Sequence, residues 1–239
     1  MEELETACIE RVRDRFLPSL EKIACEALGE RPGGGFWMEF QVDAATHSPV
    51  LLFHYPSNEP AEFEYLRRFV KMELGSLTDQ RPVGTHAIRP WVAEEFPKLL
   101  EDFRCEVVVL ELERTFWEKA TILHAEHHRD STKLIPDRFS RHYSDVAALS
   151  RHATADRALA NKDLRQRVTD WKSRFFAATW ARYDLATPGT FRLLPPESRF
   201  AELEKDYRAM RDMFLTEPQP FESLLEALKR LENRINRTI

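Results

Sequence analysis

Cysteine is scarce in this chain, and long apolar runs are absent. The 239 residues include 3 cysteines, Cys8, Cys25 and Cys105, which are scattered and form no CxxC pair. This spacing excludes a structural zinc site built on paired thiolates. No apolar stretch approaches the ~20 residues that cross a bilayer, and the charged N-terminus is unlike a signal peptide. These absences favour a protein of the reducing cytoplasm with no membrane partner. Cys25 and Cys105 stand among apolar residues, which predicts buried, inert thiols.

The composition is that of a folded globular protein. Hydrophobic residues make up 43% of the chain and charged residues 31%, and the net charge is −5. A chain of this length buries enough surface to fold without disulfides. The net negative charge argues against bulk, non-specific nucleic-acid binding, although it is compatible with a local basic groove.

Hydrophobic periodicity predicts an α+β fold. Residues 2–28 have apolar positions at helical spacing, and Pro18 is expected to kink or split that helix. Strands are expected at 36–43, 50–55, 64–75 and 104–112, the last of them buried, with a short helix near 92–100. Further helices are expected at about 113–128, 139–151, 156–182, 197–215 and 219–237. We therefore predict an incomplete α/β region over residues 1–112, followed by a helical region over residues 113–239.

Lys119 borders an apolar stripe of Phe116, Ala120 and Leu123 in a predicted helix. The ordinary interpretation is a solvated lysine paired with a neighbouring glutamate. The sharper one is a phosphate contact, because an ammonium acts as a point charge on phosphate oxygens while its stem covers apolar surface. Asp145, in the next predicted helix, either complements the helix dipole or fixes Lys119 or an incoming hydroxyl. The loop between these helices carries Arg129, Lys133, Arg138 and Arg141. Such a basic loop suits a phosphate-bearing ligand.

Other polar positions allow more than one interpretation. Glu73 lies in the strand-like stretch VKMEL and faces either solvent or a site. Arg141 and His142 beside Tyr143 suit RNA binding, because arginine and aromatic side chains stack on bases. Alternatively, Tyr143 packs in the core and Arg141 forms a surface salt bridge.

The sequence HAEHH ends the first of these predicted helices. His124 and His128 lie at i and i+4, a spacing that can chelate a cation. The zinc-protease motif HExxH is absent, and His124-Ala125-Glu126 has no PCxxC partner of the zinc-deaminase type. The default interpretation is a polar helix end at which cationic histidines complement the dipole.

Several stretches together resemble one family. ERTFWEKATILHAEHH followed by RFSRHYSDVAAL looks like the nucleotidyltransferase AbiEii/AbiGii toxin family. The closing segment KDYRAMRDMFLTEPQPFESLLEALKRLENRIN is similar to that family's C-terminal helices. VKMELGSLTDQRPVGTHAIRPWV resembles its strand that carries a third carboxylate. The resemblance covers nearly the whole chain.

The resemblance implies a polymerase-β-like nucleotidyltransferase fold in a toxin of a toxin–antitoxin or phage-defence system. Members transfer a nucleotide from an NTP to RNA, such as tRNA, with Mg²⁺, and a cognate antitoxin protein is the implied partner. By resemblance, Glu73 matches the acidic residue that helps to hold magnesium, and Lys119 matches the lysine that contacts the triphosphate. Asp145 and Arg141 match the acid and arginine of a helical RDxxD-like motif, in which His142 replaces an aspartate.

One part of the family pattern is absent from these residues. The family opens with a GG(T/S)xL turn and a DxD pair, which grip the triphosphate and bind magnesium. Gly33-Gly34-Gly35 has no such sequel, and Asp43 is not followed by a second aspartate two residues later. We therefore expect the chain to begin just after that segment and to be inactive alone. Missing strands would also leave a sheet edge that favours dimers.

Three hypotheses follow from the sequence. The first is the C-terminal part of a nucleotidyltransferase toxin. The second is a catalytically inactive descendant that binds protein or RNA in defence or anti-defence. The third is an unrelated metal-dependent enzyme centred on HAEHH. An upstream GG(T/S)xL…DxD reading frame would favour the first, and stoichiometric zinc would favour the third.

Overall fold

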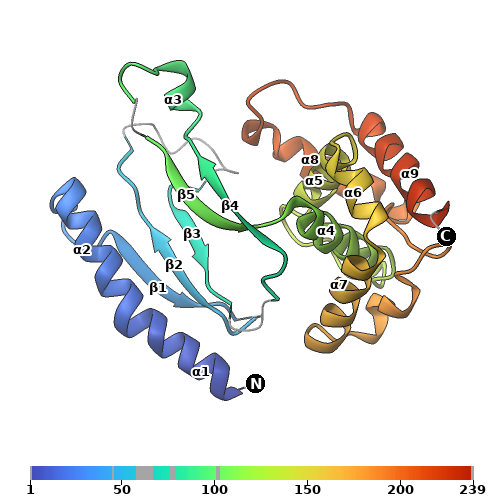
Figure 1. Ribbon diagram of the computed structural model, residues 1–239, viewed down its shortest axis with the longest axis horizontal. Helices are drawn as coiled ribbons and strands as arrows, with labels where there is room; N and C mark the ends of the chain where they lie inside the picture. The colour runs from blue at the N-terminus through green and yellow to red at the C-terminus, as the bar shows by residue number, and fades with distance from the viewer. Residues whose placement is uncertain (1, 45, 58–66, 76–78, 101–102, 238–239) are drawn as a thin grey trace. The chain divides into compact units, whose positions relative to one another are not determined.

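The structure is a computed structural model that describes residues 2–44, 46–57, 67–75, 79–100 and 103–237 (Figure 1). The chain forms two compact units, Met1–Thr78 and Asp79–Ile239. The first unit packs helices on a small antiparallel sheet, and the second joins a two-stranded ribbon to a helical bundle. The predicted α+β class is therefore confirmed in its coarse form, with a helical C-terminal region.

A helical layer opens the first unit. It comprises α1 (Glu2–Arg11), the π-helical turn η1 (Val12–Phe16) and α2 (Leu17–Leu28). Pro18 lies in the first turn of α2, directly after η1, so its missing N–H falls at the junction of the two helical segments. The predicted interruption near Pro18 is thus present, as a π-helical turn just before the proline. Glu21 then accepts hydrogen bonds from the backbone N–H groups of Trp37 and Met38, at 3.0 and 2.7 Å, which ties α2 to the first strand.

The sheet of the first unit has the order β1-β2-β3, and neighbouring strands are antiparallel. Its strands are β1 (Met38–Val42), β2 (Pro49–Phe53) and β3 (Val70–Glu73). Phe40, Leu51 and Met72 are cross-strand neighbours and pack with Val12 into the core beneath the helices. Because side chains alternate along a strand, Glu73 points to the opposite face from Met72, beside Val50. The predicted strand 64–75 is shorter than expected, and its residues 64–66 lie outside the described part of the chain.

The ribbon of the second unit pairs β4 (Val83–Ile88) with β5 (Cys105–Leu110), and α3 (Val92–Glu95) lies in the connection. The prediction of a buried strand at 104–112 was wrong in its burial, because no residue of β5 is buried. Cys25 and Cys105 are exposed, which also corrects the prediction of core thiols. Strand β4 was not predicted, since its sequence VGTHAI is short, polar in part and flanked by prolines.

Helices make up the rest of the second unit. They are α4 (Leu112–His127), α5 (Ser140–Ser150), α6 (Thr154–Ala160), α7 (Lys162–Phe175), α8 (Phe200–Ala209) and α9 (Phe221–Arg237). Short 3₁₀ turns η2 (Thr179–Ala181), η3 (Tyr183–Leu185), η4 (Glu197–Arg199) and η5 (Arg211–Met213) complete it. The predicted single helix at 156–182 was wrong. The Asn161 side chain accepts a hydrogen bond from the Leu164 N–H at 3.0 Å, so a new helix begins there. The predicted helix at 197–215 is likewise confined to α8 between 3₁₀ turns.

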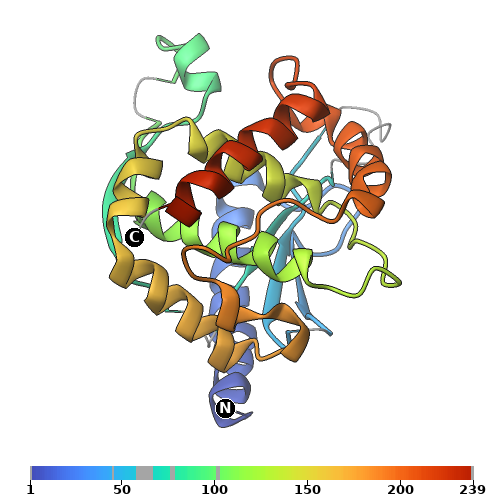
Figure 2. The same cartoon turned by 90° about the vertical axis from the view of Figure 1, so that its right-hand side faces the viewer.

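Helix α4 is the centre of this bundle, with α5, α6 and α7 packed against it (Figure 2). Phe116, Trp117 and Leu123 are at most 2% exposed. The Trp117 indole N–H donates to the Ala158 carbonyl of α6 at 3.0 Å, so the largest core ring is also hydrogen-bonded. This packing against three helices makes α4 a firm base for the polar side chains that it carries. Among the described residues, no helix is long and apolar enough to cross a membrane.

Candidate functional site

The structure brings Lys119 and Asp145 together. Lys119 projects from the middle of α4 and Asp145 from α5, and the Lys119 Nζ donates to Asp145 Oδ2 at 2.8 Å. The same Nζ lies 3.2 Å from Nδ1 of His142, which is one turn before Asp145 on α5. The Lys119 side chain is 26% exposed and that of Asp145 48%, so the cluster opens to solvent. Helix packing thus joins three residues that the sequence had separated by as much as 26 positions.

His142 is neutral at physiological pH. Burial, followed by the positive charges of Lys119 and Arg141, lowers the pKa of His142 to about 4. Because the ammonium can only donate, Nδ1 of His142 accepts and its ring proton lies on Nε2. His142 therefore orients the Lys119 ammonium without adding charge to the cluster.

The geometry leaves Lys119 with capacity for a ligand. An ammonium carries three donors, and the contacts with Asp145 and His142 use one each. The remaining donor and the partly exposed head suit an anionic oxygen from outside, such as a phosphate oxygen. The ordinary sequence interpretation, pairing with Glu118 or Glu126, does not hold here. Instead, Glu118 pairs with Arg114, and Glu126 with Arg129 and Arg199.

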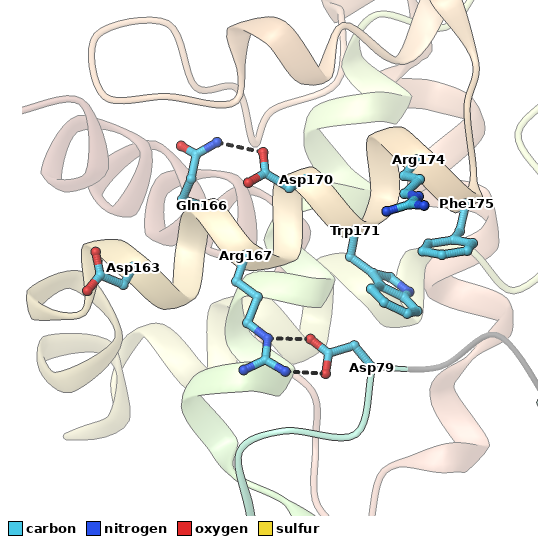
Figure 3. Close-up of a pocket in the computed structure, with 8 residues that line it drawn as sticks. All are labelled: Asp79, Asp163, Gln166, Arg167, Asp170, Trp171, Arg174 and Phe175. Atoms are coloured by element: carbon cyan, nitrogen blue, oxygen red, sulfur yellow. Dashed lines mark hydrogen bonds and ion pairs between the residues drawn. The ribbon is translucent and has the colours of Figure 1, made fainter.

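A buried ion-pair network supports this face of α4. Arg114 is 1% exposed and donates to Asp79 Oδ2 at 2.7 Å, and its Nη2 lies 2.7 Å from Glu118 Oε1. Asp79 also receives a two-pronged contact from Arg167 of α7, at 2.6 and 2.7 Å (Figure 3). Although burial alone would raise it, the hydrogen bonds from Arg167 and Arg114 lower the pKa of Asp79. This network locks the segment before β4 onto α4 and α7.

The sequence analysis missed this network. One signal was available, since Arg114, Trp117 and Thr121 lie at i, i+3 and i+7, on a stripe that is otherwise apolar or small. An arginine on a buried stripe predicts a buried carboxylate partner. Only the tertiary structure shows that this partner is Asp79, which lies 35 residues away along the chain.

Two histidines of HAEHH, His124 and His127, contact the backbone of the segment 182–194. Nε2 of His124 lies 2.9 Å from the Arg182 carbonyl, and Nδ1 accepts from the Arg192 N–H at 3.1 Å. Both ring nitrogens are therefore used by backbone. Burial lowers the pKa of His124 to about 4 and also lowers that of His128. These rings are neutral, which corrects the expectation of cationic histidines. The described part of the chain contains no group of three or more His, Cys, Asp or Glu side chains arranged to hold a metal.

The candidate RNA-contacting residues are divided by the fold. Tyr143 is 0% exposed and its ring packs beside Phe139 with centroids 6.2 Å apart. This burial corrects the base-stacking interpretation of Tyr143, because neither ring face is open to a ligand. Arg141 is exposed on the surface of α5. It remains available for a phosphate or a base.

The comparison with protein families decides the relationship. The family model described as nucleotidyl transferase AbiEii toxin, type IV toxin–antitoxin system, matches residues 6–229. The chain belongs to the AbiEii nucleotidyltransferase toxin family. The match spans both compact units and includes Glu73, Lys119 and Asp145. No curated protein and no solved structure matches the chain.

Nucleotidyltransferases of this kind typically use a divalent metal. Glu73 is the residue at issue. It lies at the end of β3 with a side chain 64% exposed, and Lys71 donates to it at 2.6 Å. Within the described residues, no second and third ligand accompany it. A single carboxylate already paired with a lysine does not by itself fit a magnesium centre.

Proposed function

We propose that this AbiEii-family protein handles a nucleotide through Lys119, with Asp145 and His142 as its positioning partners. The supporting observation is the cluster in which Lys119 Nζ contacts Asp145 at 2.8 Å and His142 at 3.2 Å. The family gives the reaction class, nucleotidyl transfer in a type IV toxin–antitoxin system. We propose an NTP as donor, an RNA such as tRNA as acceptor, and a cognate antitoxin as partner.

Lys119 acts as a pre-positioned point charge. Its stem is held by the buried face of α4, and its head is held by groups from α5, so little side-chain freedom is left to lose on binding. A phosphate oxygen of the donor accepts the remaining N–H of the ammonium. As negative charge moves onto the leaving pyrophosphate, the contact between the Lys119 ammonium and the phosphate oxygen strengthens. A fixed donor therefore stabilises the transition state of transfer.

Asp145 holds the Lys119 ammonium in place through the 2.8 Å contact with its Oδ2. Because the side chain of Asp145 is 48% exposed, it can also receive the proton of an approaching acceptor hydroxyl. We assign Asp145 the positioning role first, because its contact with Lys119 supports that role directly.

We further propose that two regions of the chain, which meet at residue 112, contribute different residues to the site. The preceding part is a partial polymerase-β-like nucleotidyltransferase sheet that carries Glu73, and residues 113–239 contribute Lys119, Arg141 and Asp145. The GG(T/S)xL and DxD motifs are absent from the 239 residues, so this chain is expected to transfer nothing with any of the four nucleotides plus Mg²⁺.

The test uses labelled nucleotide incorporation into total tRNA. In a chain fused to the GG(T/S)xL…DxD segment of a family member, Lys119→Ala and Asp145→Ala should abolish incorporation. Lys205→Ala is the matched control, because Lys205 is an exposed lysine on α8. Unchanged incorporation in the Lys119 variant would refute the site assignment. Clear transfer by the unfused chain would show a metal site that the sequence does not reveal.

A second candidate function is a scaffold without catalysis that binds RNA or protein in defence or anti-defence. The observation that favours it is the missing acidic pair, together with an intact helical bundle. It predicts that the unfused chain binds RNA or an antitoxin while the fused chain remains inactive. Incorporation by the fused chain would exclude this alternative.

A further inference from the structure

A hollow runs along the outer side of α7, entirely within the second unit. Its volume is about 460 Å³, and it is lined by side chains of α7 and by Asp79 (Figure 3). Hollows of roughly 300–1,000 Å³ are the usual size for small-molecule sites. No feature of the Lys119 cluster lies among its lining residues.

Aromatic rings form one end of the hollow. Trp171 and Phe175 lie one turn apart on α7, with ring centroids 4.1 Å apart and planes inclined by 33°. The Arg174 guanidinium lies 5.4 Å from the Phe175 centroid. Both rings are only partly buried. A tilted stack backed by an arginine provides a platform for another flat, polarisable ring.

Hydrogen-bond acceptors form the other end. The Gln166 amide N–H donates to Asp170 Oδ1 at 2.8 Å, which leaves its own carbonyl oxygen and Asp170 Oδ2 as acceptors. Asp163 adds a further carboxylate to the lining. Carboxylate and amide oxygens accept from the exocyclic amino groups of bases. Asp163 and Asp170 repel phosphate, and of the two arginines in the lining Arg167 is already paired with Asp79, so the hollow suits a base rather than a phosphate group.

The floor of the hollow is rigid. Arg167 holds Asp79 with two hydrogen bonds, and Asp79 continues to Arg114 inside the bundle. Arg114 pairs with Glu118, the residue before Lys119. Since a helix rises about 1.5 Å per residue, Lys119 lies only about 7 Å further along α4 than Arg114. The hollow and the Lys119 cluster are therefore connected through the packed interface between α4 and α7.

We propose that the hollow along α7 binds one unpaired nucleobase, stacked on Trp171 and Phe175 with its amino group directed to Asp170. The proposal rests on the proposed function, because it supplies a base site beside the proposed phosphate contact. The base belongs either to the acceptor RNA or to the incoming NTP. Adenine and cytosine, which carry amino groups, bind better than uracil.

The test measures equilibrium binding to the full chain by fluorescence anisotropy. The probes are 5′-labelled tetraribonucleotides of A, C or U, and a tetramer of the same backbone without bases. Trp171→Leu should weaken binding of the A and C tetramers by roughly five- to 150-fold, as loss of one base–aromatic stack does. Trp180→Leu is the matched control, because Trp180 is 45% exposed but lies outside the hollow. Thermal melting of both variants verifies that they are folded.

Several results would overturn the proposal. These are failure of the wild-type chain to bind any tetramer, equal binding of the tetramer without bases, or equal loss in Trp171→Leu and Trp180→Leu. Binding of a hexa-arginine peptide that depends on Trp171, without binding of tetramers, would assign the hollow to a cationic partner instead. Asp170→Asn should reduce the preference for A and C over U, which a merely structural role of Asp170 would not do.

Competition distinguishes the two sources of the base. Displacement of the labelled tetramer by ATP or CTP, but not by UTP, assigns the hollow to the donor nucleotide. Binding of tetramers with no displacement by NTPs assigns it to the acceptor RNA. The measurement needs no transfer, so it succeeds or fails independently of the Lys119→Ala incorporation test.

Discussion

Replacement of Asp79 by alanine should destabilise the second unit far more than replacement of Arg167, the exposed partner of Asp79. The side chain of Asp79 is 7% exposed and that of Arg114 is 1% exposed, with 2.7 Å between Oδ2 and Nη1. Asp79→Ala leaves the Arg114 guanidinium buried with only one of its two carboxylate partners, Glu118. Breaking a buried pair by removing one partner costs about 3–5 kcal/mol.

The structure places the expected loss near the lower limit of that range. Arg114 retains Glu118 through Nε at 2.8 Å and the Arg81 carbonyl through Nη1 at 3.1 Å. We therefore expect the free energy of unfolding to fall by about 3 kcal/mol. At roughly 2–4 °C per kcal/mol for a unit of this size, Tm should fall by about 6–12 °C.

The assay is urea unfolding followed by far-UV circular dichroism at pH 7, with Arg167→Gln as the comparison. Arg167 is 50% exposed, and its removal leaves Asp79 paired with Arg114, so the loss should stay below about 1 kcal/mol. Asp79→Asn should fall between these variants, because it retains an acceptor but no charge. Equal losses in Asp79→Ala and Arg167→Gln, or a loss below about 0.5 kcal/mol in Asp79→Ala, would refute the reasoning.

The same pair has a defined pH dependence. The pKa of Asp79 is lowered in the folded chain below its ordinary value of 3.8. Its contribution is therefore fully present above pH 3.8 and is lost as the pH falls through the lower folded pKa. The stability difference between the wild-type chain and Asp79→Ala should accordingly be constant near neutral pH and shrink only in strong acid.

Two further predictions concern other buried and exposed groups. Because the pKa of His124 is lowered from 6.5 to about 4, the unfolded chain takes up a proton there that the folded chain does not. Stability should fall between pH 6.5 and about 4, by roughly 3 kcal/mol from this residue. His124→Gln should flatten that part of the pH profile in urea unfolding, and an unchanged slope would contradict the burial argument. Cys25 and Cys105 are exposed while Cys8 is half-buried, so a thiol reagent should modify the first pair in the native chain at mildly alkaline pH. Modification of Cys8 at the same rate would contradict the described packing of α1.

Local patterns in the sequence determined much of the helical architecture. Apolar spacing placed α4, α5 and α9 within a residue or two of their observed bounds, because their buried faces repeat at the helical period. Pro18 marked the interruption between α1 and α2, since a proline is tolerated only in the first turn of a helix. The family motifs also selected Lys119 and Asp145 before any contact was known.

Pairing and burial were decided by tertiary structure. Strand β4 exists because its short, partly polar sequence pairs with β5, a partner reached only when the chain folds back. The side chains of β5 look like core residues by composition, but none of them is buried in the fold. Asn161 divides a continuous helical pattern because its side chain caps a new helix.

The chemistry of the sites shows the same division. The sequence by itself supplied an ammonium, a carboxylate and three histidines at suggestive positions. Only packing of α4 against α5 brought Lys119 within 2.8 Å of Asp145, and only the fold, through burial and neighbouring positive groups, lowered the pKa values of His124 and His142. Asp79, Arg114 and Arg167 are far apart in the chain, and no local pattern predicts that they meet. Residue types and periodicity are local properties, whereas pKa values, ion pairs and hollows depend on which distant groups the fold brings together.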